Sequence, residues 1–267
     1  MLVVGSNNSA HDIAAAAWEA GVTVTMLQRS STHVVRSDRF VEHAIGPLYS
    51  EDAVDAGIDV HTGDLLFASQ PYRIMHRWQK PIYDLIRSED AEFYERLEAA
   101  GFDVDFGEDD SGLTMKYLRR GSGYYIDVGA SELVANGDIE LRRGEIAEVV
   151  ADGVVLTDGS RIESDVLVYA TGYRSMIRLA ADVLGDEVAD RVGRVWGLGS
   201  GTAKDPGPWE GEERNMWKPT QQRNLWFQGG NLQQARFYSL LLALQLKARQ
   251  EGIDTPVYAL PESHHTE

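Results

Sequence analysis

Polar residues follow a short apolar run at the start of the sequence, and their spacing suits phosphate binding. The run "LVVG" ends at Gly5, and four polar residues come next: Ser6, Asn7, Asn8 and Ser9. Such a turn binds the pyrophosphate of a dinucleotide when a strand leads into it and a helix N-terminus, with its positive dipole, follows it. The usual spacing places glycines at the positions of Asn7 and Ala10. Alanine is accepted at the latter, and asparagine adopts a positive φ more readily than other non-glycine residues, so we expect the turn to survive.

This turn alone does not separate a cofactor site from a phosphate-free connection, but the end of the next strand adds a second indication. An NAD site places an acidic residue there for the ribose hydroxyls, whereas an NADP site needs cationic and hydroxyl donors for the 2′-phosphate. This chain has "QRSST", in which Arg29 can hold a phosphate with two hydrogen bonds and Ser30 can donate a third. Together the two features favour NADPH over NADH. The alternative is an ordinary surface arginine at a strand end.

The elements that would position these residues form a βαβ unit. Residues 2–5 have the pattern of a strand buried on both faces, and residues 22–31 have that of a second strand. Between them, residues 6–21 predict an alanine-rich helix that is capped by asparagine and serine side chains and ended by Gly21.

Downstream, the pattern predicts a helical insertion, a small sheet and a final helix. The insertion covers about residues 38–101, and Pro71 and Pro81 are expected to break it into pieces. Then "SELVANG" predicts a short helix, "DIELRRG" a strand, and two Asp-Gly pairs an antiparallel β-meander. The remaining expected elements are a buried strand in "DVLVYATGY", a strand in "LWFQGG" and a long amphipathic helix stopped by Gly252.

Composition excludes several function classes. The 267 residues, 43% of them apolar, suffice for one or two domains, and the formal charge of −17 disfavours nucleic acid and anionic membranes as partners. The absence of cysteine excludes disulfides, thiolate metal sites and a cysteine nucleophile. We expect no membrane span and no secretory signal, so the cytoplasm is the default location. We expect no metal site, and His264 and His265 fall in a tail that reads as a frayed, solvated end.

Four segments carry a resemblance to a known family: "VVGSNNSAHDIAAAAWEAGVTVTMLQRSSTHVV", "GYYIDVGASELVANGDIELRRGEI", "DVLVYATGY" and "NLWFQGGNLQQARFYSLLLALQLKA". Over roughly residues 1–251 the chain resembles flavin-containing monooxygenases, in particular their bacterial branch of flavoprotein monooxygenases. The resemblance places residues 6–9 and Arg29 at the NADPH pyrophosphate and 2′-phosphate positions.

The resemblance also implies residues toward a flavin. Ala170, Thr171 and Gly172 match the Ala-Thr-Gly signature at the junction of the NADPH and FAD domains. Gly230 and Asn231 match a Gly-Asp pair that contacts the FAD ribitol, with Asn231 in place of the acid. A strand-to-helix turn in which Asn231 is only the N-cap is an equally weighted alternative.

The fold class implied is α/β: a Rossmann-like three-layer NADPH-binding domain at residues 1–165 with a helical insertion and an antiparallel β-meander, then the C-terminal part of an FAD-binding domain at 166–267. The implied enzyme is an NADPH-dependent flavin monooxygenase that transfers a hydride to FAD and one oxygen atom from O2 to a small organic substrate. We nominate no catalytic residue.

No second Gly-rich strand–helix motif follows Gly5, so we expect this chain to be the C-terminal portion of such an enzyme, dependent on an N-terminal FAD-binding segment or a partner chain. A non-catalytic NADP(H)-binding module or a degenerate, partner-dependent subunit is the alternative. The related pyridine nucleotide-disulfide reductases need a redox cysteine pair and are excluded.

Overall fold

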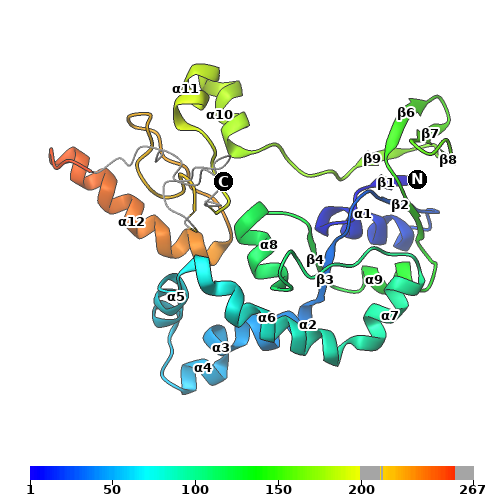
Figure 1. Ribbon diagram of the computed structural model, residues 1–267, viewed down its shortest axis with the longest axis horizontal. Coiled ribbons are helices and arrows are strands. Elements are labelled where there is room, and N and C mark those ends of the chain that lie inside the picture. The colour runs from blue at the N-terminus through cyan, green and yellow to red at the C-terminus, as the bar shows by residue number, and fades with distance from the viewer. Residues whose placement is uncertain (199–210, 212, 256–267) are drawn as a thin grey trace, which may run out of the picture. The chain divides into compact units, whose positions relative to one another are not determined.

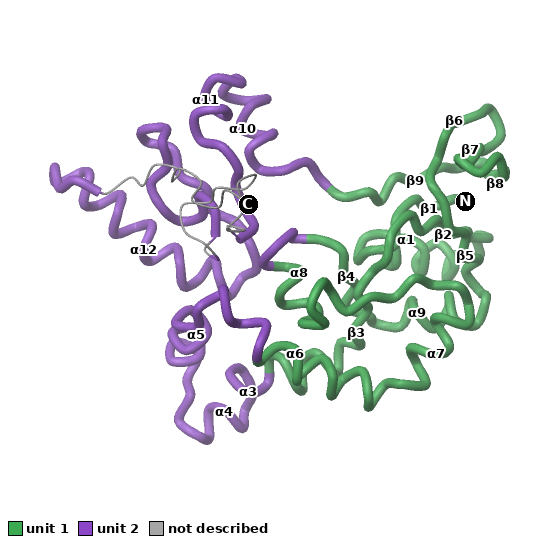
Figure 2. Tube along the Cα trace, viewed as in Figure 1, with its two compact units in different colours: residues 1–45, 78–117, 122–172 green, residues 46–77, 118–121, 173–267 purple. Residues whose placement is uncertain are grey.

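The computed structural model describes residues 1–198, 211 and 213–255 (Figure 1). The chain forms two compact units, which Figure 2 distinguishes by colour. Unit 1 comprises Met1–Ile45, Trp78–Tyr117 and Ser122–Gly172, and unit 2 comprises Gly46–Arg77, Leu118–Gly121 and Tyr173–Glu267. The tail with His264 and His265 lies outside the described residues. Within the described ranges, no helix has both the length and the apolar character needed to cross a membrane.

The elements of unit 1 are β1 (Leu2–Val4), α1 (Asn8–Glu19), β2 (Thr25–Gln28), β3 (His33–Arg36), α2 (Ser37–Arg39), the π-helix η1 (Phe40–Ile45), α7 (Ala91–Ala99), β4 (Tyr124–Asp127), α9 (Ala130–Ala135), β5 (Glu140–Arg143), β6 (Ile146–Val150), β7 (Gly153–Leu156), β8 (Arg161–Glu163) and β9 (Leu167–Tyr169). Those of unit 2 are α3 (Gly46–Tyr49), α4 (Glu51–Asp55), α5 (Val60–Ala68), α10 (Met176–Leu184), α11 (Asp186–Val192) and α12 (Leu232–Gln250). Two helices contribute residues to both units: α6 (Tyr72–Glu89) and α8 (Gly112–Arg120).

A four-stranded parallel sheet organises unit 1, with the strand order β5-β2-β1-β9. The strands β2 and β5 extend to one side of β1, and β9 lies on its other side. The strand order therefore reverses at β1. In open parallel sheets, ligands bind outside the carboxyl ends of the strands at such a reversal.

Alternation along the strands gives this sheet three layers, as the sequence predicts. Val3 and Met26 pack in one cluster with Ala10 and Ala14 of α1, whose small side chains let the helix approach the sheet closely. Leu2 and Leu27 point to the opposite face, because successive strand residues alternate. There they pack against apolar residues of the meander, namely Val154, Leu156 and Ile162. The meander β6-β7-β8 is antiparallel, which confirms the prediction from the Asp-Gly pairs.

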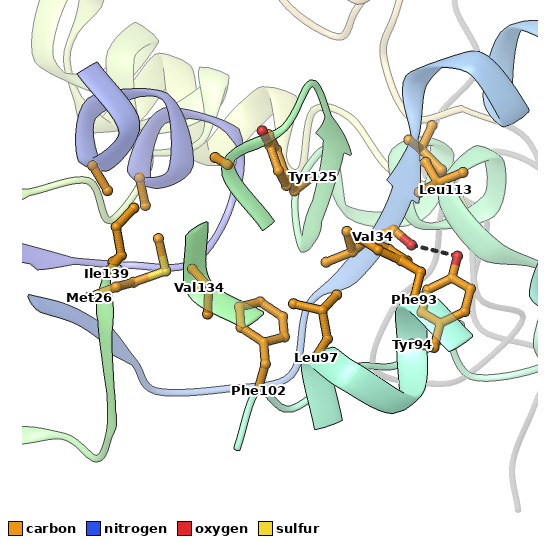
Figure 3. Close-up of a cluster of buried hydrophobic side chains, with 14 of the residues drawn as sticks. Met26, Val34, Phe93, Tyr94, Leu97, Phe102, Leu113, Tyr125, Val134 and Ile139 are labelled. Atoms are coloured by element: carbon orange, nitrogen blue, oxygen red, sulfur yellow. Dashed lines mark hydrogen bonds between the residues drawn. The ribbon is translucent and has the colours of Figure 1, made fainter. Parts of the chain in front are cut away.

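The cluster on the α1 face continues around a second, two-stranded parallel sheet of β3 and β4 (Figure 3). Val34 of β3 and Tyr125 of β4 are fully buried, and α7 adds Phe93 and Leu97. The hydroxyl of Tyr94 donates to the Val34 carbonyl at 2.9 Å, so this buried polar group is satisfied (Figure 3). Neither strand is predicted from the sequence.

Pro81 does not break the helical insertion, contrary to the prediction. Pro71 does precede the start of α6, but α6 then continues through Pro81 to Glu89. Proline cannot donate to the carbonyl of Arg77, and this interior position costs about 3 kcal/mol. Tyr83 and Ile86, on the turns that follow, are fully buried in the core of unit 1, and their burial offsets that cost.

Two predicted strands also differ. β9 covers only part of "DVLVYATGY" and is the edge strand of its sheet, so Tyr169 is 60% exposed rather than buried. The segment "LWFQGG" forms no strand; Phe227 makes one isolated bridge with Met216. Leu225 and Phe227 pack in the apolar cluster of unit 2 around Trp217, and burial there takes the place of sheet pairing.

Unit 2 holds a charge pair between α5 and α12 in which the carboxylate is buried and the arginine is half-exposed. Arg236 donates two hydrogen bonds to the carboxylate of Asp64, both at 2.6 Å, and the hydroxyl of Tyr49 donates a third at 3.0 Å. Hydrogen bonds from Arg236 hold the pKa of Asp64 below its usual value, although burial opposes this. The final helix α12 has the predicted extent, with Gly252 just past its end, but it is not amphipathic as predicted: Leu232, Leu240 and Leu244 are exposed, and the buried side chain of the helix is the polar Gln234.

Candidate nucleotide-binding site

Gly5 lies at the reversal of the parallel sheet, immediately after β1. Its φ is +129°, and a Cβ atom at this position would lie 2.4 Å from the carbonyl oxygen of Ala170, the residue that follows β9. Backbone bonds fix both residues, because Gly5 donates to Leu27 at 3.0 Å and Ala170 donates to Val4 at 2.8 Å. Two residues predicted for the site, far apart in sequence, thus meet at the edge where a ligand is expected.

Asn7 replaces a motif glycine without the positive φ that the sequence analysis expects. Its backbone is extended, with φ −98° and ψ −169°, so no glycine is required there. Its side chain does not cap α1. Instead, Thr32 donates to Oδ1 of Asn7 at 3.3 Å, and the hydroxyls of Ser6 and Thr32 are 2.7 Å apart. The predicted side-chain cap is therefore wrong, because the asparagine amide is turned toward Thr32.

The N-terminus of α1 consequently keeps its backbone donors open. Among the described residues, none accepts a hydrogen bond from the amides of Asn8, Ser9 or Ala10. The first amides of a helix have no intrahelical acceptor, and the helix dipole gives this end a partial positive charge. The turn can therefore donate several hydrogen bonds to an anion.

The side chains of the turn differ in what they can offer a ligand. Asn8 is committed to β4, because it donates to the Tyr124 carbonyl at 3.3 Å and accepts from the Ile126 amide at 3.0 Å. Ser6 is buried against Thr32, whereas Ser9 is exposed. Ser6 and Asn8 can thus serve a ligand through backbone amides, and Ser9 through its hydroxyl as well.

Arg29 and Ser30 lie directly after β2 and are exposed. The Arg29 side chain is 71% exposed, and it pairs at 3.9 Å with the carboxylate of Glu145, which is 62% exposed. A surface pair of this kind contributes little, so a phosphate can displace it. The preceding Gln28 is buried and exchanges two hydrogen bonds with the backbone of Asp103. The residues at the end of β2 therefore expose the guanidinium of Arg29 to solvent and include no acidic side chain.

Two further arginines stand beside Arg29, and the sequence analysis does not nominate them. Arg142 and Arg143 end β5, and Arg143 pairs in register with Gln28. Arg143 also bonds to Asp103 at 2.6 Å. The signal was present in "ELRRG", because two arginines close a predicted strand. Arg142 in turn lies 3.6 Å from Glu140, so both of these arginines already have acidic partners.

The other nominated residues are less closely tied to the turn. Thr171 and Gly172 continue past Ala170 and are exposed. Gly230 and Asn231 belong to unit 2, where Gly230 has a φ of +88° and Asn231 is the N-cap of α12. Oδ1 of Asn231 accepts from the amide of Gln234 at 2.8 Å. Asn231 is therefore the N-cap of α12, and its contact with a flavin stays a prediction.

The donor set of unit 1 fits a phosphorylated dinucleotide. Open helix amides at the strand reversal suit a pyrophosphate, and the exposed Arg29 with Ser30 suits a further phosphate group. Among the described residues, no group of three or more acidic or histidine side chains could hold a metal ion.

Comparison with known proteins found similarity at the level of structure. No model of a known protein family and no curated protein matches the chain. One matching structure is a cyclohexanone monooxygenase mutant from Rhodococcus sp. Phi1 bound to NADP+, with 20% identity and a TM-score of 0.38 over 66% of this chain and 39% of that one. Another is ε-caprolactone-bound cyclohexanone monooxygenase in the loose conformation, with 17% identity and a TM-score of 0.38 over 66% and 40%. The chain thus spans about two fifths of the length of these enzymes.

Proposed function

We propose that this chain binds NADPH at the β1–α1 turn of unit 1 and forms part of a flavoprotein monooxygenase. The observation that carries the proposal is the uncapped N-terminus of α1 at the sheet reversal, with exposed Arg29 at the end of the neighbouring strand. The amides of residues 8–10 would hold the pyrophosphate, and Arg29 with Ser30 would hold the 2′-phosphate.

The flavin part of the proposal rests on the resemblance of the sequence segments and on Gly230 and Asn231 at the start of α12. When bound, NADPH would supply a hydride, and a flavin with O2 would supply the chemistry for oxygenating a small organic substrate. The contribution of this chain is to bind and orient the nucleotide. An N-terminal FAD-binding segment or a partner chain would complete the enzyme.

Titration of the purified chain with NADP+ and NAD+ tests the nucleotide site. Arg29→Ala should weaken NADP+ binding about tenfold or more, because a charge-assisted phosphate contact is lost, and should change NAD+ binding less than about twofold. Arg96→Ala is the matched control, because Arg96 is a half-exposed arginine of α7 that pairs with Glu132. Equal losses for both nucleotides in Arg29→Ala would contradict the 2′-phosphate assignment.

The same preparation tests the flavin assignment. After incubation with excess FAD and removal of the free cofactor, a retained visible flavin absorbance would support the monooxygenase and exclude the non-catalytic module. Binding of NADP+ with no retained flavin, even with the FAD-binding segment supplied, would favour the module.

A further inference from the structure

His11 is a fully buried histidine in the first turn of α1, next to the proposed pyrophosphate site. Its ring Nδ1 lies 3.2 Å from the carbonyl oxygen of Asn7, and its backbone amide donates to the same oxygen at 3.1 Å. A carbonyl oxygen only accepts, so the ring proton is on Nδ1 and Nε2 carries a lone pair. This Nε2 is buried and has no hydrogen-bond partner among the described residues.

A buried ring nitrogen without a partner costs stability, so the imidazole needs a reason to be there. Its ring stacks on Tyr125 with centroids 3.9 Å apart and an interplanar angle of 8°, and Phe102 lies 5.7 Å away. Burial lowers the pKa of His11 to about 4, although the bond to Asn7 and the nearby Asp127 oppose the shift. A phenyl ring would meet these packing demands without the unpartnered atom. What it could not supply is the donor to Asn7.

Asn7 is the residue whose conformation decides whether the turn can bind an anion. If its side chain rotated to cap α1, it would take an amide that a phosphate needs. Thr32 holds the side chain from one side, and His11 holds the carbonyl from the other. A turn fixed in this way loses little conformational freedom on binding.

We propose that His11 is a positioning residue of the nucleotide site: its Nδ1–H holds the Asn7 carbonyl and so keeps the amides of residues 8–10 directed at the pyrophosphate. This inference rests on the proposed NADP(H) function of the same turn. It assigns to a neutral, buried histidine a role in affinity rather than in proton transfer.

Two substitutions of His11 in the full chain separate the donor from the ring. His11→Phe keeps the stacking on Tyr125 but removes the donor and the unpartnered nitrogen. We expect it to melt at the same or a higher temperature while NADP+ binds about tenfold more weakly. His11→Thr loses the ring but regains a donor, because a threonine hydroxyl in a helix can bond to the carbonyl four residues earlier. We expect it to melt lower and to bind NADP+ within about threefold of the wild type.

His33→Phe is the matched control, because His33 is equally buried, also has an unpartnered Nε2, and donates to Asp105 rather than to the turn. It should leave NADP+ affinity unchanged. Two outcomes would overturn the role of His11 while leaving the proposed function intact. In the first, the wild type binds NADP+ and His11→Phe binds it equally tightly. In the second, the wild type binds NADP+ and His11→Thr binds it as weakly as His11→Phe. Failure of the wild type to bind NADP+ would overturn the proposed function itself.

Discussion

At the scale of single residues, Gly5 makes the strictest demand on the turn. A Cβ atom there would approach the Ala170 oxygen to 2.4 Å, and its φ of +129° is unfavourable for any other residue. We therefore expect Gly5→Ala to lower the free energy of unfolding by about 2–4 kcal/mol and to abolish NADP+ binding, because β1 and β9 must separate to admit the methyl group.

Gly21→Ala separates strain from steric clash in this prediction. Gly21 also has a positive φ, +81°, but a Cβ atom there would have no neighbour within 4 Å. It should cost only about 1 kcal/mol in urea unfolding measured on the same protein, and binding should survive. Similar losses in the two variants would show that the contact with Ala170 does not matter.

Positions that depend on the local chain could be predicted from the sequence, and side-chain conformations that depend on distant partners could not. Gly5 and Arg29 are positioned by the strand–turn–helix order alone. The side-chain conformation of Asn7 depends on Thr32, and the burial of His11 depends on Tyr125, which lies on a strand that the sequence analysis does not predict. These side chains could only be interpreted once β3 and β4 were in place.

At the scale of elements, the strongest local signals were reliable. Alanine content predicts α1, and the Asp-Gly pairs predict the meander, because both act through neighbouring residues. The strands β3 and β4 were not predicted, because they depend on pairing with each other across about ninety residues of chain rather than on a local turn signal. The prediction at Pro81 was wrong for the converse reason: burial of the surrounding helix outweighs a local penalty.

The pair of Asp64 and Arg236 gives an element-scale prediction, because it joins α5 to α12. Asp64 is 3% exposed and accepts two charge-assisted bonds from Arg236, so Arg236→Ala leaves a buried carboxylate without its cation. We expect a loss of about 2–3 kcal/mol in the free energy of unfolding of unit 2, below the value for a fully buried pair because the Arg236 side chain is 49% exposed. Chemical denaturation followed by tryptophan fluorescence measures it.

Lys247→Ala provides the comparison on the same helix. Lys247 pairs with Glu251 one turn later, and both side chains are more than half exposed. Such pairs contribute about 0.5 kcal/mol or less, so this variant should unfold close to the wild type. A loss as large as that of Arg236→Ala would mean that the burial of Asp64 is not what makes its pair important.

At the scale of the whole molecule, the division into units is the feature least visible in the sequence. The helical insertion predicted at about 38–101 is shared between the two units, with its middle part in unit 2 and its ends in unit 1. The division depends on contacts such as that between Asp64 and Arg236, which join segments far apart in the chain. The predicted boundary between an NADPH-binding domain that ends at residue 165 and part of an FAD-binding domain that begins at residue 166 stays a prediction.

The two buried histidines make stability depend on pH in a defined window. Burial lowers the pKa of both His11 and His33 to about 4, from 6.5 in a solvated chain. Between these pH values the unfolded chain binds protons that the folded chain does not. The free energy of unfolding therefore has its full value above pH 6.5 and falls as the pH drops toward 4. At about 1.4 kcal/mol per pKa unit, acidification from above pH 6.5 to pH 4 removes on the order of 3 kcal/mol of stability for each histidine, which is a large part of the stability of a domain. The contribution of Asp64 is lost only below its ordinary pKa of 3.8, so the effects of Asp64 and of the histidines fall in different pH ranges.

Urea unfolding at pH 7, 6 and 5 should therefore show a steep decline of stability in the wild type and about half that slope in His33→Phe. A wild-type stability that is flat over this range would contradict the neutral burial of both rings.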